Sequence, residues 1–323
     1  MKPHIIASYE DCINNINLRT FVYSHILNPH LKCAVTGVKL HYKDKCEVFY
    51  GHSVSKDINR AVQSSKYEVL ERIFCCDILM HTSTYNLYRY SNNIKIGHVN
   101  REDISLRGVS DIGATGLSCH KSICEAKEHG LYEVLERHIL SSMWYGDLIL
   151  HPIQINEPAG DGLTISSYST AVPSNFCISV LRNNDNTMFF SGSAISDEME
   201  KSIEKSRNEA FMLINNYYNG ELHNLKGVRK SSAENIKRLV GLDAKIINEH
   251  FDLKVHFNDG SVIFKKLDIE SQLHAFGFSL NDASYAIVRD EEGFFITKSF
   301  LHNALSKECC RQERGHILHD PFC

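Results

Sequence analysis

The chain has 323 residues, a formal net charge of −4 and a pI near 6.5. This charge argues against a nucleic-acid-binding surface, which needs a basic face. No apolar run reaches the roughly 18 residues of a membrane span, and the first residues lack the apolar core of a signal peptide. We therefore expect a cytoplasmic protein with neither a nucleic-acid nor a membrane partner. No linker rich in proline, glycine and serine divides the chain, which predicts a single domain with lobes over residues 1–323.

The 11 cysteines do not indicate a structural zinc site. Cys119 and Cys124 lack the Cys-x-x-Cys spacing of zinc ligands, and adjacent residues such as Cys75 and Cys76 point to different sides of an element. In a reducing compartment we expect buried or free thiols. The histidines are scattered without a His-x-x-x-His spacing, so an unrelated histidine-based metal hydrolase is the weakest alternative for the function.

The first predicted elements are a hairpin and a helix. Two β-prone runs at residues 33–42 and 46–50 predict paired strands, the second of which we expect to end at Gly51. A helix is predicted from about Lys56 to about Met80. Its apolar stripe consists of Val69, Leu70, Ile73 and Phe74. On its opposite side we expect Glu68, Glu71 and Arg72.

A second helix follows a glycine-containing loop at residues 113–116 and is predicted over about 122–144. At about 100° per residue, one arc of roughly 120° carries three carboxylates and a guanidinium. These residues are Glu125, Glu133, Glu136 and Arg137. Leucine and valine side chains lie across from this arc, so we expect the charged face to lie outside the core.

The rest of the chain predicts a third helix among further strands. This helix is expected to start at Ser196-Asp197, with Glu200 completing its cap, and to run to about Tyr218. Strands are predicted at 175–181 and 187–191, and hairpins at 253–257 with 261–265 and at 283–289 with 294–299. The turn signal Asn258-Asp259-Gly260 joins the first hairpin. Strands that precede, separate and follow helices predict an α+β fold with a mixed sheet and helices packed on it.

The hexapeptide Tyr-Glu-Val-Leu-Glu-Arg occurs twice, at Tyr67–Arg72 and at Tyr132–Arg137. Each copy places two carboxylates and an arginine at i, i+3 and i+4, which share one helix face. A single copy is usually a solvated face. Two copies, each after a strand and a glycine loop, indicate acidic surfaces that converge around cations. Magnesium prefers carboxylate and phosphate oxygens, and arginine binds phosphate through two hydrogen bonds. No P-loop and no protein-kinase signature is present, so these helices are the candidates for a nucleotide site.

Three regions of the chain resemble the YcaO superfamily of ATP-utilising enzymes. The first comprises Gly51-His52-Ser53 and Ser64–Arg72, similar to the family's Gly-Lys-Gly turn and Ser-Ala-x-x-Glu-Ala-x-Glu-Arg helix. The second comprises Ala114–His120, Glu125-Ala126 and Gly130–Arg137, similar to Ser-Asn-Gly-Leu-Ala-Ala-Gly, Glu-Ala and Glu-x-x-Glu-Arg. The third comprises Gly192 and Lys205–Ala210, similar to Arg-Ala-x-x-Glu-Ala. Order and spacing fit from about residue 30 to about 220. The resemblance therefore implies an ATP-site core over this range, with C-terminal hairpins and a tail over 221–323.

The resemblance also implies roles for particular residues. Magnesium ions that hold ATP would be bound by Glu68, Glu71, Glu125, Glu133, Glu136 and Glu209. The nucleotide would be contacted by Arg72, Arg137, Lys205, Gly116 and Ser118. Lys205 stands where the family often has arginine, which keeps the charge but loses the bidentate fork.

The chain departs from the family pattern in its loops and in its tail. His52 stands for the usual lysine, Ala114 for serine and His120 for a small residue. Cyclodehydratase members often end in a Pro-x-Pro-x-Pro tail that reaches the active site, whereas this chain ends in His316–Cys323 with one proline. The terminal carboxylate at Cys323 is the candidate catalytic base.

The activity that the resemblance implies is ATP- and magnesium-dependent modification of a backbone amide in a ribosomally made peptide, such as a bacteriocin precursor. Cyclodehydration of Cys, Ser or Thr to azolines is the first expectation and thioamide formation the second. A non-catalytic scaffold subunit is the alternative that the departures favour. The expected partners are the precursor peptide, a separate peptide-binding protein and a flavin-dependent dehydrogenase, in a homodimer or a hetero-complex.

Overall fold

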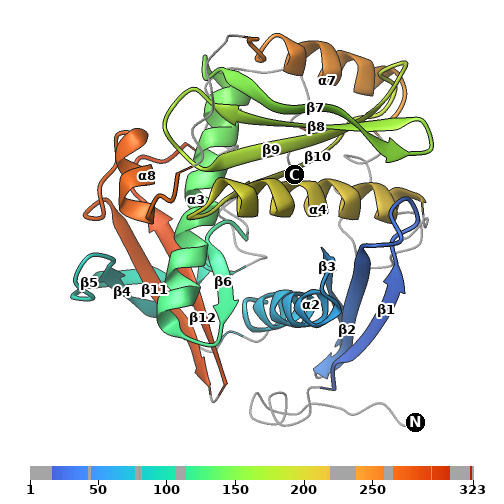
Figure 1. Cartoon of the computed structure of the whole chain (residues 1–323). Helices are drawn as coiled ribbons and strands as arrows, with labels where there is room; N and C mark the ends of the chain where they lie inside the picture. The colour runs from blue at the N-terminus through green and yellow to red at the C-terminus, as the bar shows by residue number, and fades with distance from the viewer. Residues whose placement is uncertain are drawn as a thin grey trace.

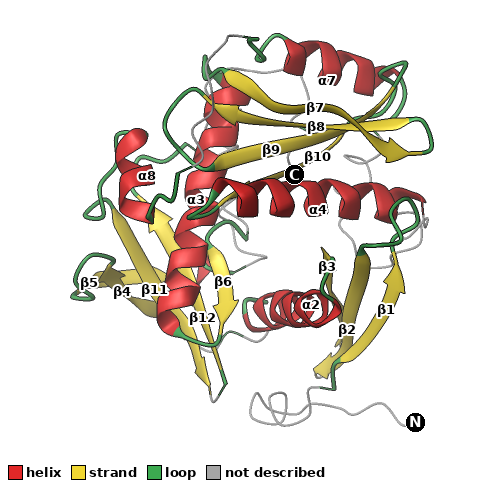
Figure 2. Cartoon of the chain, in the orientation of Figure 1, coloured by secondary structure: helices red, strands yellow, loops and turns green. Residues whose placement is uncertain are grey.

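Three antiparallel sheets and the helices between them make up the protein (Figure 1). The computed structural model describes residues 17–42, 45–76, 80, 82–105, 114–218, 238–257, 265–291, 293–305 and 321. The α+β class is confirmed, and Figure 2 shows strands and helices interleaved along the chain. The sheets differ from the expected mixed sheet because every strand ladder of the described residues is antiparallel.

The first sheet has the order β1-β2-β3, and one helix covers it. Its strands are β1 (Arg19–Ser24), β2 (Lys32–Tyr42) and β3 (Lys45–Ser55), and its helix is α2 (Ile58–Phe74). The predicted hairpin is confirmed. The expectation that Gly51 ends the second strand is wrong, because β3 continues to Ser55 with Gly51 paired opposite Thr36. The helix also ends earlier than predicted, at Phe74, where the backbone N–H of Cys75 caps it by donating a hydrogen bond to Glu71 O.

The second sheet has the order β10-β9-β8-β7 and carries a helix on each face (Figure 1). Its strands are β7 (Leu150–Gly160), β8 (Leu163–Thr170), β9 (Phe176–Asn183) and β10 (Phe190–Ile195); its helices are α4 (Met199–Tyr218) and α7 (Leu242–Asp252). The predicted strand at 187–191 begins later, at Phe190, because Thr187 is held in a turn by the Asp185 carboxylate. The third helix begins at Met199, a few residues after the predicted start.

The third sheet joins strands from distant parts of the chain. Its order is β5 (Lys95–Asn100), β4 (Thr84–Arg89), β11 (Ala283–Glu291), β12 (Phe294–Leu301) and β6 (Leu117–His120). The nearby helices are α3 (Ile123–Tyr145), α8 (Ile269–Ala275) and the 3₁₀ turn η1 (Arg101–Asp103). The predicted hairpin at 283–289 and 294–299 is confirmed as β11 and β12. Although it lies beyond the expected ATP-site core, β12 pairs directly with β6, which immediately precedes α3.

One predicted strand is wrong. Residues 253–257 form no strand: α7 runs to Asp252, Leu253 caps it through bonds to Glu249 O and Phe251 O, and Val255 makes an isolated bridge to Leu150. The helix and its cap use the backbone groups that a strand would need, so tertiary context overrides β propensity. The expected turn at 258–260 and most of the second strand lie outside the described residues.

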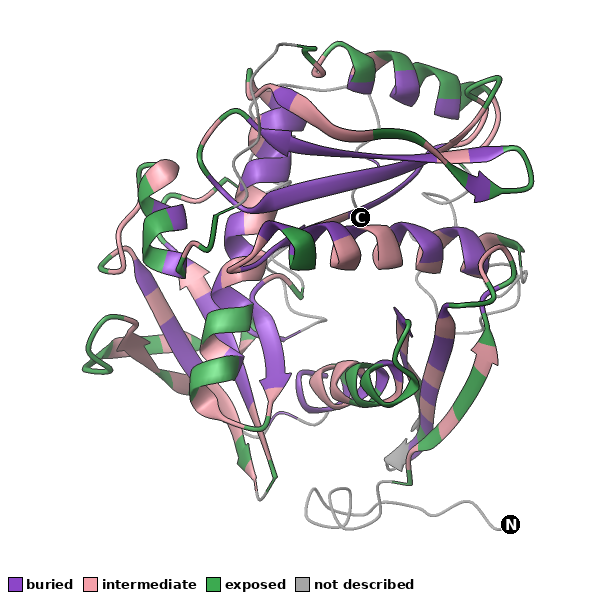
Figure 3. Cartoon of the chain, in the orientation of Figure 1, coloured by how far each residue is buried: buried purple, intermediate pink, exposed green. Residues whose placement is uncertain are grey.

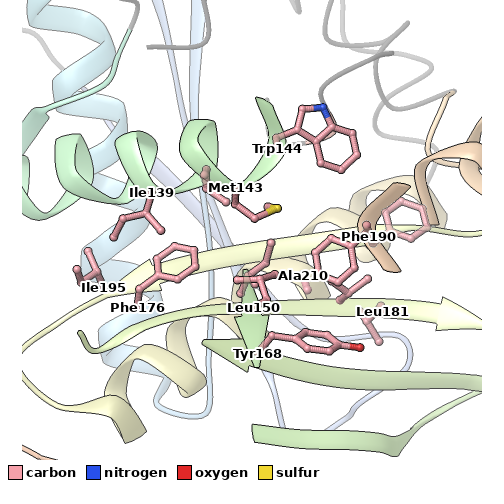
Figure 4. Close-up of a cluster of buried hydrophobic side chains, with 14 of the residues drawn as sticks. Ile139, Met143, Trp144, Leu150, Tyr168, Phe176, Leu181, Phe190, Ile195 and Ala210 are labelled. Atoms are coloured by element: carbon pink, nitrogen blue, oxygen red, sulfur yellow. The ribbon is translucent and has the colours of Figure 1, made fainter. Parts of the chain in front are cut away.

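The largest core cluster lies where α3 meets the second sheet. Figure 4 shows Ile139, Met143 and Trp144 of the helix beside Phe176 and Phe190 of the strands, and all five are buried. Burying one such side chain contributes about 2 kcal/mol. Figure 3 shows that burial follows the inner faces of the sheets and helices. Among the described residues, no helix has the length and apolar character to span a membrane.

Candidate functional site

Each carboxylate-bearing helix packs directly on a strand or loop at a glycine. A Cβ atom added to Gly51 would lie 2.1 Å from Ser65 O of α2, and one added to Gly192 would lie 2.2 Å from Ser206 O of α4. For α3 both sides are glycine: a Cβ on Gly130 would lie 2.5 Å from the carbonyl oxygen of Gly116, whose φ is +80°. The helix backbones can approach this closely only because no side chain intervenes.

The same contact fixes one glutamate in each of the three helices. The amide of His52 donates to Glu68 Oε2 at 2.6 Å, and that of Ser193 donates to Glu209 Oε2 at 2.7 Å. In α3 the amide of Gly116 donates to Glu133 Oε2 at 3.1 Å. Each glutamate stands 17 residues after its glycine (51 to 68, 116 to 133, 192 to 209). The three strand–glycine–helix units therefore present their first carboxylate in the same way.

A second set of contacts links neighbouring units. Glu71 of α2 accepts a hydrogen bond from the amide of Cys119 in β6 at 2.6 Å, and Glu136 of α3 accepts one from Ser193 Oγ in β10 at 2.6 Å. The helix α4 in turn packs near β3, but it carries Met212 at the position equivalent to Glu71 and Glu136. The units thus follow one another in a closed cycle. We call the five glutamates that it gathers the carboxylate ring: Glu68, Glu71, Glu133, Glu136 and Glu209.

The electrostatics of the carboxylate ring disfavour the charged form of four of its glutamates. Burial raises the pKa of Glu71 well above its ordinary value, and the charge of Glu133 raises it further. Burial raises the pKa of Glu136 to about 8, with Arg137 opposing the rise and Glu209 adding to it. Burial likewise raises the pKa values of Glu133 and Glu209, and Arg137 opposes both shifts. Buried like charges of this kind are relieved by bound cations or by protons.

The donor set fits magnesium, which prefers carboxylate oxygens. One amide or hydroxyl donor uses only one of the roughly four lone-pair positions of a carboxylate. In the present conformation, no three His, Cys, Asp or Glu side chains of the described residues are grouped closely enough to hold a metal ion. A bound ion would therefore draw the glutamates together or complete its shell with water and phosphate oxygens.

Two predicted arginines lie at the ring in different ways. Arg137 acts electrostatically on Glu133, Glu136 and Glu209, which places it among three acids. Arg72 donates to Glu68 Oε1 one helical turn away, and almost half of its side chain is exposed. Both guanidinium groups are thus close enough to the ring to meet a ligand that it binds.

Lys298 of β12 is a site residue that sequence reasoning missed. Its side chain is fully buried, and burial lowers its pKa to about 8 against the opposing charge of Glu133. The available signal was a lysine in the middle of the apolar strand Phe294–Leu301, because a buried lysine is rare unless it is paired. Lys298 supplies positive charge to the ring from the C-terminal part of the chain.

The other predicted residues are spread around the ring. Glu125 is exposed at the start of α3, where it accepts a hydrogen bond from Ser122 Oγ at 3.0 Å. It lies about 12 Å along the helix from Glu133, so it does not join the ring here. Lys205 is half-buried on α4, and burial lowers its pKa while Glu136 opposes the shift. Ser118 is buried in β6, and its hydroxyl has no hydrogen-bond partner within the described part of the chain. Cys323 lies outside the described residues.

No protein-family model and no curated protein sequence matches the chain. Its fold nevertheless matches solved structures. A chain of the E. coli microcin synthetase McbBCD complex with pro-MccB17 bound superposes with a TM-score of 0.68 at 11% identity, covering 94% of this chain and 96% of that one. YcaO from Methanopyrus kandleri bound with AMPPCP and Mg²⁺ gives 0.59 at 13% identity, covering 90% and 86%. A heterocyclase in complex with substrate and cofactor gives 0.63 at 9% identity, covering 90% of this chain and 50% of that one. At these identities the likeness is one of fold.

Proposed function

We propose that the carboxylate ring binds ATP through Mg²⁺. The resemblance of the motifs to the YcaO superfamily and the likeness in fold to solved YcaO structures support this proposal. The observation that carries the proposal is the gathering of five glutamates from three helices, four of them with raised pKa values. Bound magnesium would neutralise both the ring and the triphosphate. Glu68, Glu71, Glu133, Glu136 and Glu209 would hold the ions. Glu125, exposed at the start of α3, stays a candidate for an outer ion.

In this proposal the chain's own groups position charge before any ligand arrives. The amides of His52, Gly116 and Ser193 orient one carboxylate each, so a bound ion would draw together groups that are already oriented. Arg137, Arg72 and Lys205 would contact phosphate oxygens, and Gly116 and Ser118 would line the nucleotide. This machinery serves binding and orientation, which can supply a large part of the catalysis in phosphoryl transfer.

The proposed reaction is cyclodehydration of a peptide backbone amide. A Cys, Ser or Thr side chain of the peptide adds to the amide carbonyl, and the resulting oxygen takes the γ-phosphoryl group of ATP, releasing ADP. The oxygen then leaves as phosphate while the nitrogen loses its proton, which gives an azoline. The terminal carboxylate of Cys323 is the proposed base. Thioamide formation, with an external sulfur donor in place of the side chain, would use the same ATP step.

The proposed partners follow from the same comparisons. One matching structure holds pro-MccB17 in a multi-subunit synthetase and another holds a substrate, which supports a ribosomal precursor peptide as substrate here. We propose a separate peptide-binding protein, a flavin-dependent dehydrogenase that oxidises the azoline, and either a homodimer or a hetero-complex, all in the cytoplasm.

A non-catalytic scaffold subunit is the second candidate, and one observation favours it. Arg72 is bonded to Glu68, and no three acids of the described residues are grouped for a metal ion. A decayed site that keeps its fold would look the same. The two candidates differ in what they predict for nucleotide binding.

Calorimetric titration with ATP and Mg²⁺ tests the proposal. We expect binding by the wild type, and a loss of at least about tenfold in affinity for Glu133→Gln, since a charged ligand group is removed. Glu249→Gln, on the exposed face of α7, is the matched control and should bind like the wild type. The activity is then followed as the loss of one water mass per ring from the precursor peptide, with the partner proteins present. Nucleotide binding without any mass change or phosphate release would favour the scaffold over the enzyme, and no binding at all would refute the ATP site.

A further inference from the structure

Each of the three sheets has one edge strand at the carboxylate ring and one that lies away from it. The strands at the ring are β3, β6 and β10, whose amides at His52, Cys119 and Ser193 donate to ring glutamates. The outer edge strands are β1, β5 and β7 (Figure 1). A free strand edge is a template for pairing with another chain, and proteins usually protect it with proline, charge or irregular pairing. The three outer edges can therefore be compared by their protection.

Two of the outer edges are protected. Strand β7 contains Pro152 and Pro158, and its pairing with β8 shifts register at several positions. Strand β5 begins with Lys95, and its pairing with β4 also contains a register shift. Proline removes a backbone donor, and an irregular edge does not match a regular incoming strand. Neither strand therefore offers a ready surface for pairing.

Strand β1 is built differently. All six of its residues pair with β2 in one unbroken register. Its sequence Arg-Thr-Phe-Val-Tyr-Ser carries a single charge, at the first position, and otherwise consists mainly of β-branched and aromatic residues, which favour strands. The residues Phe21 and Val22 are 69% and 39% exposed. The outer edge of the first sheet is therefore regular, apolar and open to another strand.

A hydrogen bond at the end of β1 shows which of its backbone groups point outward. The amide of His25 donates to the carbonyl of Leu31 at 3.0 Å, which continues the register of β1 with β2. Backbone groups of an antiparallel strand point alternately to its two sides, so those of every second residue before His25 point to the free edge. The outward residues are Thr20, Val22 and Ser24. The contact of 2.9 Å between the hydroxyls of Thr20 and Thr36 agrees, because side chains approach most closely in pairs without mutual backbone hydrogen bonds.

We propose that β1 pairs with β1 of a second copy of this chain, antiparallel and about a two-fold axis at Val22. In this register the outward backbone groups meet one another, because Val22 lies opposite its own copy and Thr20 lies opposite Ser24 of the second copy. On the other face, Phe21 lies opposite Tyr23 of the second copy. Aromatic pairs and Thr–Ser pairs are among those that stabilise antiparallel strands.

The strand is complementary to itself, which favours a second copy over an unrelated strand. Its one charged residue, Arg19, lies at the end of the pairing and does not face its own copy. The pairing would join two three-stranded sheets into one and remove the unprotected edge from both chains. Strands of six residues form a small interface, so we expect a dissociation constant in the micromolar range. The inference goes beyond the proposed function, which names neither a surface nor a register for a homodimer.

Sedimentation velocity of the full chain, from about 1 to 100 µM, tests the pairing. The wild type should associate over this range. Val22→Lys and Val22→Glu each place like charges opposite one another at the axis, so each should weaken association at least about tenfold. An equimolar mixture of the two variants should associate again, because lysine then faces glutamate. Ile96→Lys, at a 46% exposed position of the outer strand β5, is the matched control and should associate like the wild type.

Hydrogen exchange of individual amides identifies the surface. The amides of Thr20, Val22 and Ser24 should become protected as the protein concentration rises, whereas those of Phe21 and Tyr23 should be protected throughout. Thermal unfolding of each variant checks its fold.

Three results would overturn the proposal. A wild type that stays monomeric at about 100 µM would leave this edge to a different chain. A Val22→Lys protein that associates as tightly as the wild type would place the interface elsewhere, and a mixture of the charge variants that stays monomeric would exclude the two-fold axis at Val22. None of these measurements contains nucleotide, so their failure is distinct from a failure of the ATP site.

Discussion

The segments β1–α2 and β8–α4 are built alike, although their helices carry different charges. In each, three antiparallel strands are covered by the helix that follows them, and a line of hydroxyl groups crosses the strands to the helix. Thr20, Thr36 and Ser65 form this line in the first segment, with oxygen–oxygen distances of 2.9 and 2.7 Å. In the second it is formed by Ser167, Ser179 and Ser206, again at 2.9 and 2.7 Å. Gly51 pairs with Thr36 and Gly192 with Ser179, so the packing glycine occupies the same place in both.

The repeat in the sequence and the repeat in the architecture do not coincide. The hexapeptide is shared by α2 and α3, whereas α3 packs on a sheet assembled from distant strands. The packing is shared by α2 and α4, whereas α4 has Met212 and Leu213 where α2 has Glu71 and Arg72. The strand glycine therefore fixes where the first carboxylate stands. The helix sequence decides how many charges follow it.

The largest effect is expected where the two segments are most alike. Gly51→Ala and Gly192→Ala would each place a methyl group about 2 Å from a helix carbonyl, and we expect each to lower the free energy of unfolding by about 3 kcal/mol or more. Urea unfolding measures the loss. Gly97→Ala in β5 is the control, since nothing lies within 4 Å of the added atom. A Gly51→Ala protein as stable as the wild type would show that this close packing is dispensable.

A smaller effect is expected from the charges in which the segments differ. The pKa of Glu136 is about 8 in the folded chain, above the value of about 4.3 in unfolded chains. Between these values the folded state binds more protons, so stability falls as pH rises through this window, by about 1–3 kcal/mol between pH 5 and 8 without metal. Mg²⁺ should reduce this loss, and so should Glu136→Gln.

Thermal unfolding across pH, with and without Mg²⁺, measures this slope. Glu249→Gln serves again as the control and should keep the wild-type slope. A metal-free protein that becomes more stable from pH 5 to 8 would contradict the raised pKa of Glu136.

The smallest effect concerns the hydroxyl lines. Ser65→Ala and Ser206→Ala should each cost about 1 kcal/mol, because each removes a buried hydrogen bond and leaves its partner unsatisfied. The exposed Ser64→Ala should be near neutral. Urea unfolding measures these losses. Equal losses in the free energy of unfolding would support the equivalence of the two segments, whereas clearly unequal losses would contradict it.

The parts of the fold that sequence reasoning predicted are those with strong local periodicity. The three acidic helices, the first hairpin and the pair β11–β12 were accessible in this way, and so were the glutamates of the ring. Gly51 was misjudged because glycine both ends strands and permits close packing, and only the packing partner Ser65 distinguishes the two. Leu253–Phe257 was misjudged because a short apolar run does not reveal that a helix cap uses its backbone.

The site residues that sequence reasoning did not predict are those that tertiary structure brings to the ring. Ser193 binds Glu136 across 57 positions of sequence, and Lys298 reaches Glu133 from a strand that no motif marks. The equal spacing from Gly51, Gly116 and Gly192 to their glutamates was present in the sequence. The spacing alone does not reveal that each helix packs on the glycine before it, and this contact is what places the glutamate beside the backbone amide.

Ser193 couples the two sides of the ring. Its amide holds Glu209 of α4 and its hydroxyl holds Glu136 of α3, so neither carboxylate can move to meet an ion without straining the hydrogen bond of the other. An ion bound at one of these two glutamates would therefore change the affinity of the other for its ion, through one residue of β10. Such coupling would pass through the amide and the hydroxyl of Ser193, without any direct contact between the ions.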